Sequence, residues 1–239
     1  MNEFDAILLN AKIPKPSGYH FYFKNYIFNG IDLGNKNLLD LGGGNGIASF
    51  FALYQSSSCN AWVVDPIAEG SNQLMTDQFN HMKESFGKDR INYHRDFIDS
   101  LEEPNYFDIV LMHNSINHIG EDLIEKILTS QEEYSEYVER IKKITGRLKP
   151  GGTLVVADCG RNNFWDGVGL KSPFAPTIEW KLHREPDTWK KMIEETGPVH
   201  INTKWTARRE LRSIGKTLLG NRLCSYLLGS HFVSMYRKV

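Results

Sequence analysis

The chain has 239 residues and a formal net charge of −1, with 41% hydrophobic and 24% charged residues. This ordinary globular composition excludes a disordered or fibrous chain, and the balanced charge excludes a protein that is basic throughout and binds polyanions. The length predicts one large domain, or one domain that carries an insertion.

Cysteine usage and hydropathy indicate the cellular compartment. Cys59, Cys159 and Cys224 lie far apart and form no C-x-x-C pair, which argues against a disulfide framework or a multi-cysteine zinc site. The first residues lack the basic region of a secretory signal. No apolar run reaches the roughly 18 residues of a membrane-spanning helix. We therefore expect a cytoplasmic protein without a transmembrane segment.

Residues 1–36 are rich in aromatic side chains, and we expect them to form a helical flank or lid. From residue 37 to residue 158, apolar runs alternate with helical stretches, which predicts βαβ units and a parallel sheet. The predicted strands are Asn37–Leu41, Asn60–Val64, Ile91–Tyr93, Phe107–Met112 and Thr153–Ala157. The predicted helices are Ile47–Gln55, Ser71–Phe86, Glu121–Leu128 and Glu132–Leu148.

Residues 159–225 break this alternation. We expect an insertion that caps the carboxyl end of the sheet, followed by a basic helix over Lys204–Arg222, where apolar residues recur at three- and four-residue steps. His231–Arg237 is predicted to be a last strand. Residues 226–239 would then complete the sheet of the 37–158 core.

A glycine-rich turn follows the first predicted strand. Glycines let the backbone turn sharply and approach a ligand, and the helix that follows points its first N–H groups at that ligand. A dinucleotide fingerprint, G-x-G-x-x-G, needs a glycine at residue 47, which is Ile47. The spacing is instead D-x-G-x-G-x-G, made by Asp40, Gly42, Gly44 and Gly46.

This spacing resembles the first motif of the class I S-adenosylmethionine-dependent methyltransferases of small-molecule type. The FDIV run at 107–110 and the LKPGG turn at 148–152 are also similar to motifs of that family. The resemblance covers about residues 37–158 and the last strand. It implies a doubly wound, Rossmann-like α/β fold with a seven-stranded, mostly parallel sheet, an antiparallel last strand and a small helical, aromatic cap. It also implies S-adenosyl-L-methionine as cofactor and S-adenosyl-L-homocysteine as product.

The resemblance assigns cofactor contacts along the strand ends. Asp65, before Pro66, would accept the ribose hydroxyls, although a dinucleotide enzyme also places an acid there. Asp96 would accept from the adenine amino group, with Asp99 as the register alternative, and the Phe97 N–H would meet the ring. The complete expected set is Asp40, Gly42, Gly43, Gly44, Asn45, Gly46, Asp65, Pro66, Asp96, Phe97, His113 and Asn114, with Tyr19 and Tyr22 against the sulfonium.

The chemistry that follows needs an aligned acceptor and, for a hydroxyl acceptor, a base with a pKa near neutral, usually a histidine. His118 matches by register the base histidine of plant-type small-molecule O-methyltransferases and is the first candidate. His113 and His183 are the other two candidates. The acidic and amide side chains near Asp158 are too few to form a metal site, so we expect no metal.

The absence of one motif and the distribution of charge along the chain both bear on the identity of the methyl acceptor. No (N/D/S)-P-P-(F/Y/W) motif follows the fourth strand, which argues against nucleic-acid substrates. From residue 204 onward, eight basic residues stand against one acid, a net +7 that leaves −8 for residues 1–203. We expect a hydroxyl of a small molecule or glycan, anionic or lipid-linked. Contact of the basic stretch with an anionic membrane surface is another use of these charges.

Other functions stay open at this point. One is a non-catalytic, S-adenosylmethionine-binding or regulatory protein of the same fold, and another is an N-methyltransferase. A nicotinamide oxidoreductase is disfavoured by Ile47. The oligomeric state is likewise open.

Overall fold

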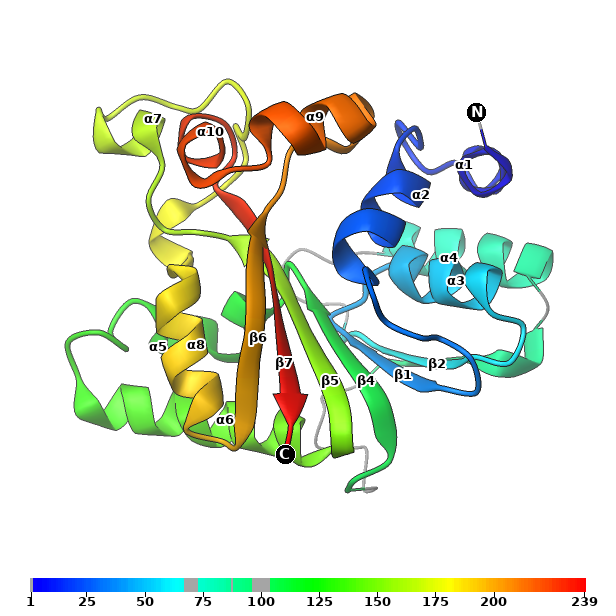
Figure 1. Ribbon diagram of the computed structural model, residues 1–239, viewed down its shortest axis with the longest axis horizontal. Coiled ribbons are helices and arrows are strands. Elements are labelled where there is room, and N and C mark those ends of the chain that lie inside the picture. Colours follow the sequence, from blue (N-terminus) through cyan, green and yellow to red (C-terminus); the bar gives the residue numbers. More distant parts are fainter. Residues whose placement is uncertain (1, 67–72, 87, 96–103) are drawn as a thin grey trace.

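The chain forms one sheet with helices on both faces (Figure 1). The computed structural model describes residues 2–66, 73–86, 88–95 and 104–239. The strands of these residues are β1 (Asn37–Leu41), β2 (Asn60–Val64), β3 (Ile91–His94), β4 (Phe107–His113), β5 (Leu148–Cys159), β6 (Pro198–Trp205) and β7 (His231–Lys238). Their order is β3-β2-β1-β4-β5-β7-β6. The neighbours among β1 to β5 pair in parallel, and β7 is antiparallel to β5 and β6. The predicted Rossmann-like, mostly parallel fold is confirmed.

The described helices lie in four groups along the chain. The amino-terminal flank holds α1 (Glu3–Asn10), α2 (Tyr19–Tyr22) and a π-helical turn (Phe23–Ile27). The helices between the parallel strands are α3 (Ile47–Gln55), α4 (Gln73–Phe86), α5 (Glu121–Ile124) and α6 (Gln131–Gly146). After β5 come α7 (Phe164–Gly167) and α8 (Pro186–Glu194), and α9 (Arg212–Leu219) and α10 (Arg222–Leu227) lie between β6 and β7. None of the described helices is long and apolar enough to cross a membrane.

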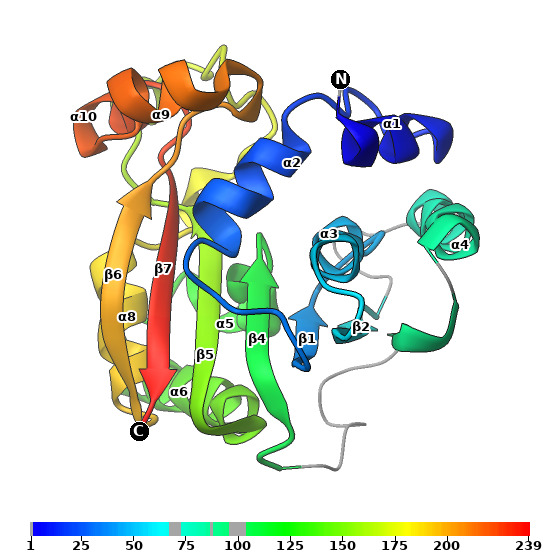
Figure 2. The same ribbon diagram turned by 45° about the vertical axis from the view of Figure 1, so that its right-hand side comes forward.

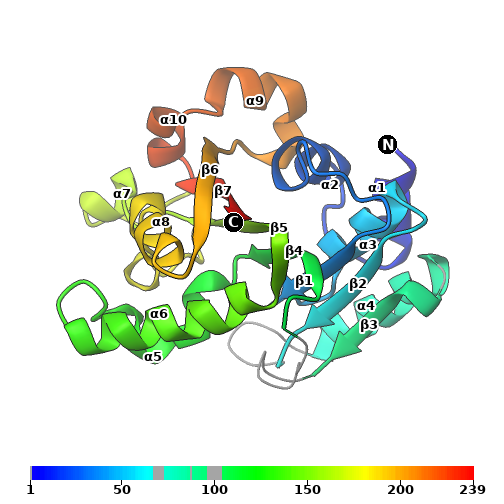
Figure 3. The ribbon, with the colours of Figure 1, turned by 60° about the horizontal axis from the view of Figure 1, so that its bottom comes forward.

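Both faces of the sheet are buried, which explains why the parallel strands read as continuous apolar runs. In β1, Leu38 joins the core beneath α1 and α3, whereas Leu39 joins the core beneath α6 and α8. Figure 3 shows α3 on one side of the strands and α6 with α8 on the other. Trp189 of α8 is fully buried in the second core, against Tyr137 of α6.

One buried carboxylate fixes the amino-terminal flank. Asp5 of α1 is fully buried and accepts hydrogen bonds from the backbone N–H groups of Gly18, at 3.0 Å, and His20, at 3.1 Å. These bonds hold the start of α2. Phe4 packs edge-on against Phe51 of α3, with ring centroids 5.2 Å apart. The flank therefore lies at the carboxyl end of β1 and over α3 (Figure 2).

The stretch after β5 differs from the sequence expectation. A strand, β6, occupies Pro198–Trp205 and pairs with β7, so this part of the stretch expected to form the cap extends the sheet instead. The helix α8 packs on one face of the sheet. The helix predicted over Lys204–Arg222 is wrong as one element. Trp205 ends β6, Arg212 has a positive φ of 45°, and two short helices, α9 and α10, follow.

Candidate functional site

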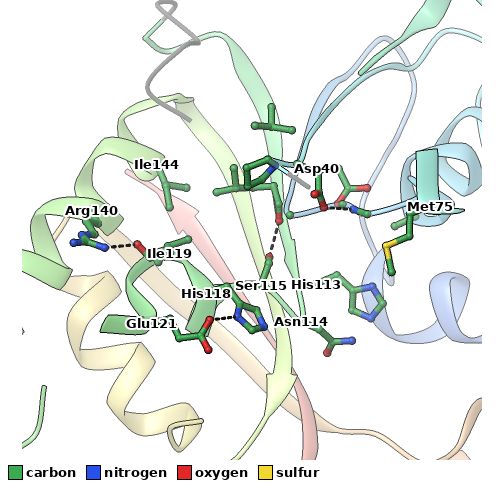
Figure 4. A pocket seen from close by; sticks show the side chains of 18 of the residues that line it. Asp40, Met75, His113, Asn114, Ser115, His118, Ile119, Glu121, Arg140 and Ile144 are labelled. Carbon is green, nitrogen blue, oxygen red and sulfur yellow. Dashed lines mark hydrogen bonds and ion pairs between the residues drawn. The ribbon is translucent and has the colours of Figure 1, made fainter. Parts of the chain in front are cut away.

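A cavity of about 980 Å³ opens at the carboxyl ends of β1, β2 and β4. The glycine turn and Asp65 line it, as do Tyr19 and Phe23 of the amino-terminal flank. His113 and His118 also line it, as Figure 4 shows. In parallel α/β sheets, ligands bind in this crevice outside the strand ends. The volume is at the upper end of that of small-molecule sites, so two ligand parts fit side by side.

The glycine turn has the shape that its composition predicts. Gly42, Gly44 and Gly46 have positive φ values of 68°, 54° and 72°. A Cβ on Gly42 would lie 2.4 Å from the Cβ of Ser115, which follows β4. The Ser115 hydroxyl donates to the Leu41 carbonyl at 2.6 Å and ties that segment to the turn. Only glycine allows these two segments to approach so closely.

Two buried carboxylates stand beneath this turn. Asp65 is 2% exposed and accepts a hydrogen bond from the Gly44 N–H at 2.7 Å. Asp40 is 1% exposed and accepts from the Ser49 hydroxyl at 2.8 Å. Burial raises the pKa of Asp40 to about 6. Both carboxylates line the cavity, as do Gly43, Asn45 and Pro66.

His113 ends β4 and lies in a tight polar cluster. Its Nε2 is 3.3 Å from the Tyr22 hydroxyl, and its ring lies 6.3 Å from that of His231. Burial, and to a smaller extent the charge of Arg209, lower the pKa of His113 to about 4. His113 is therefore a neutral imidazole at physiological pH.

The next residue, Asn114, adopts a positive φ of 55° and connects His113 to His231. Its side-chain oxygen is 3.1 Å from Nε2 of His231, and Nδ1 of His231 is 3.0 Å from the Thr206 hydroxyl. Burial lowers the pKa of His231 to about 3. With Nε2–H donating to Asn114 and Nδ1 accepting from Thr206, both ring nitrogens are satisfied in the neutral form.

His118 lines the same cavity, one turn after β4. Its Nδ1 is 2.9 Å from a carboxylate oxygen of Glu121, and its Nε2 is 3.4 Å from the side-chain nitrogen of Asn117. The Glu121 carboxylate only accepts, so it fixes the proton on Nδ1 and leaves the lone pair on Nε2. The imidazole is thus held in the tautomer that can take up a proton.

The remaining candidates lie elsewhere. His183 is buried, with Nδ1 3.2 Å from Asp158, and is not among the residues that line the cavity. Tyr22 and Gly46 are likewise not among the lining residues, although Tyr22 contacts His113, which is. Asp96, Phe97 and Asp99 lie outside the described residues. Within the described part of the chain, no group of three or more His, Cys, Asp or Glu side chains is arranged to hold a metal ion.

Among the residues that sequence reasoning did not assign are Ser115 and Glu121 of the lining, and His231 and Arg209, which contact lining residues. Glu121 had a readable signal, because it lies three residues after His118, where helical geometry brings side chains together. Arg209 gave none. It is 194 residues from Lys15, whose carbonyl it contacts, and its guanidinium lies 4.1 Å from the Tyr19 ring centroid.

The fold has many solved counterparts. A methyltransferase from Aquifex aeolicus described as SAM-dependent is 11% identical, with a TM-score of 0.61 and full coverage of both chains. The 1,6-didemethyltoxoflavin-N1-methyltransferase of Burkholderia thailandensis, solved with S-adenosylhomocysteine, is 11% identical over 99% of this chain and 86% of its own, with a TM-score of 0.58. A putative O-methyltransferase from Nostoc punctiforme is 12% identical, with a TM-score of 0.58 over 99% of this chain, which spans 61% of that protein.

These likenesses show the fold, and the family rests on the sequence itself. The comparison with curated proteins found no match. The sequence matches the family described as "Methyltransferase domain" over residues 15–212, which is most of the chain. That match includes the glycine turn, both strand-end carboxylates and the two histidines of the cavity. The chain therefore belongs to the methyltransferase domain family, as its glycine motif predicted, with S-adenosylmethionine as its cofactor.

Proposed function

We propose that this chain transfers the methyl group of S-adenosylmethionine to a hydroxyl of a small-molecule acceptor, with His118 as the general base. The observation that carries the proposal is that the glycine turn, the Asp65 carboxylate and the His118–Glu121 pair line one cavity. A cofactor site and a proton acceptor thus share one enclosed space.

The residues present fit the cofactor. The glycines with positive φ leave the turn without side chains, so that its backbone can approach the ligand closely. Asp65 supplies a buried carboxylate at the end of β2. S-adenosylmethionine, when bound, supplies an already activated methyl group. The protein then has three tasks: to hold the cofactor along the turn, to align the acceptor oxygen in line with the methyl group, and to exclude water.

The His118–Glu121 pair suits the proton step. A hydroxyl loses its proton as it attacks, and a neutral imidazole within hydrogen-bond distance can accept it. The Glu121 carboxylate, 2.9 Å from Nδ1, orients the ring and stabilises the imidazolium that forms. His113, held in the neutral form by burial, is better suited to flank the cofactor.

The apolar side of the cavity supports water exclusion. Phe23 is 1% exposed and lines the wall beside Tyr19. Tyr19 stacks on Phe23, with ring centroids 5.6 Å apart, and also carries the guanidinium of Arg209 over its ring. Phe23 and Arg209 thus already contact the ring of Tyr19. Contact of Tyr19 or Tyr22 with the sulfonium stays a prediction.

A second candidate is methyl transfer to an amine, and the charge of the cavity favours it. Toward α6, the lining residues include Glu121, Asp122, Glu136 and Glu139 against Arg140 and Lys143. An acidic wall attracts a cationic acceptor and disfavours an anionic one. None of the basic residues of 204–222 is among the lining residues, so their charge is not inside the cavity.

Calorimetry with S-adenosylmethionine and S-adenosylhomocysteine tests the cofactor assignment, and absence of binding to both would overturn the proposal. Incubation with a methyl-labelled cofactor and matched pools of hydroxylated and amine metabolites then tests the acceptor. Mass spectrometry should find one added methylene on a hydroxylated compound. Methylation confined to the amine pool would favour the second candidate.

A further inference from the structure

The outer surface of α9 and α10 is unusually apolar for an exposed surface. Eleven of the fifteen large hydrophobic side chains that are exposed among the described residues lie between Val168 and Leu227, counting both. Six of them form what we call the cap face: Leu211, Ile214, Leu218, Leu223, Tyr226 and Leu227. Figure 1 shows α9 and α10 at the end of the molecule where the parallel strands finish, with α9 on the side toward α2. Clustered exposed apolar side chains mark a binding surface.

The orientation of α9 is the reverse of that of an ordinary surface helix. Ile214 and Leu218, one turn apart, share a flank and are 72% and 65% exposed. The residue that α9 buries is Gly215, whose Cβ would lie 2.6 Å from the Leu211 side chain. A surface helix normally turns its apolar row to the core. Here that row faces solvent.

Basic residues occupy the other side of α9 and the start of α10. Arg212 and Lys216, also one turn apart, lie on the opposite flank of α9, and Arg222 begins α10 with its side chain 73% exposed. From Lys204 to Leu228 the chain has six basic residues and one acid, Glu210. The cavity does not use these charges. Arg208, Arg209 and Lys216 make contacts within the molecule. Arg212 and Arg222, the latter 4.0 Å from Glu185, are exposed and suit a partner of opposite charge.

We propose that the cap face binds the surface of an anionic lipid bilayer. Aliphatic side chains on one flank and basic side chains on the other are the features of a helix that lies in the plane of a membrane surface. Each basic residue near an anionic leaflet is attracted to it, and the exposed aliphatic side chains add apolar burial. Binding of this kind needs no spanning helix.

The cap face also adjoins the cavity wall. Arg209, just before α9, lies against Tyr19, which lines the cavity, and Lys216 is 3.4 Å from Asn25 of the amino-terminal flank. Membrane binding would place this wall at the lipid surface, where an amphiphilic acceptor gathers. The docking itself is independent of methyl transfer and is measured without cofactor.

Co-sedimentation with vesicles tests the proposal. The intact chain should bind phosphatidylcholine vesicles that contain phosphatidylserine at least about tenfold better than pure phosphatidylcholine vesicles, and salt should weaken this binding. The double variant Ile214→Asp/Leu218→Asp should lose it, as should Arg212→Glu/Arg222→Glu. Matched controls are Leu128→Asp, at a side chain 64% exposed beyond α5, and Lys142→Glu on α6. Both controls should bind as the unmodified chain does.

Three outcomes would overturn the proposal: no binding to anionic vesicles, equal binding to both vesicle types, or equal loss in the control variants. Circular dichroism and thermal melting establish that each variant folds. Sedimentation velocity without lipid provides a separate check. A dimer that the Ile214→Asp/Leu218→Asp variant abolishes would assign the cap face to a second copy of the chain and would also overturn the proposal.

Discussion

The Asp65 carboxylate accepts a hydrogen bond from the Gly44 backbone N–H at 2.7 Å, and this bond ties the end of β2 to the glycine turn after β1. A carboxylate accepts about four hydrogen bonds, so one group can hold the turn and accept from ligand hydroxyls. The acid that the family resemblance assigns to the ribose therefore also shapes the turn that is predicted to receive the cofactor.

Replacing Asp65 should test both roles. Asp65→Ala should weaken S-adenosylmethionine binding by about 100-fold or more, because charge-assisted hydrogen bonds are worth about 1.5–3 kcal/mol each. Asp65→Asn keeps an acceptor oxygen and should retain part of the affinity. Isothermal calorimetry measures both. Unchanged affinity in Asp65→Ala would contradict the assignment of the cavity as the cofactor site.

Two glycine-to-alanine variants compare the effect on stability of a crowded glycine with that of an uncrowded one. A Cβ on Gly43 would lie 2.8 Å from both Asp40 Cγ and Val63 Cγ1, although the φ of Gly43 is not positive. Gly43→Ala should cost about 1–3 kcal/mol of folding free energy. Gly146→Ala, at the end of α6, meets nothing within 4 Å and should be neutral or stabilise by up to about 1 kcal/mol. Urea denaturation of both variants checks the contrast.

The two cavity histidines should respond differently to substitution. His118→Gln should lower kcat by about 10²–10⁴ and leave cofactor affinity unchanged, as expected on loss of a general base. Glu121→Gln should cause a smaller loss, since the ring keeps its position but loses its charge partner. His113→Gln should instead alter cofactor affinity. If His113→Gln lowers kcat and His118→Gln does not, the roles are exchanged.

The pH dependence of stability should reveal the buried histidines. The native pKa values of His113 and His231, about 4 and about 3, lie below the unfolded value of 6.5. The unfolded chain therefore binds more protons below about pH 6.5, and the free energy of unfolding should fall as pH falls from there toward about 4. Asp40, with its pKa raised to about 6, binds its proton more readily when folded and opposes this trend between about pH 6 and 4.

Comparing variants isolates the histidine contribution. Urea titrations at about pH 7 and about pH 5 should show a smaller loss of stability for His113→Gln and His231→Gln than for the unmodified chain. Arg209→Gln provides a second check, because removal of this nearby charge should raise the pKa of His113, as measured by NMR. An equal pH dependence in all the chains would show that both histidines titrate normally.

The sequence predicted the elements that local pattern determines. The predicted helix Ile47–Gln55 has the bounds of α3, and the five predicted parallel strands lie within or at β1 to β5. The glycine turn was recognisable because its backbone demands are local. β6 was not recognisable from the sequence, because its described strand partner is β7, which follows it in the chain, and its side chains do not alternate cleanly between buried and exposed.

Contacts between distant segments account for the rest of what was missed. His231 reaches Asn114 across 117 residues, and Arg209 reaches Tyr19 from the opposite end of the chain. Neither contact leaves a periodic trace in the sequence. The predicted role of His118 stays a prediction, but its partner Glu121 lies within one helical turn and was accessible to the same reasoning.

The position of β7 between β5 and β6 has a consequence for the order of synthesis. Among the described strands, β6 has β7 as its sheet neighbour and pairs with none of the parallel strands, although it precedes β7 in the chain. A nascent chain that has emerged from the ribosome only as far as β6 therefore has no place to add it to the sheet. His231, the first residue of β7, also completes the polar cluster behind the cavity. Assembly of the outer sheet and of the cavity's supporting contacts thus waits until β7 has been translated.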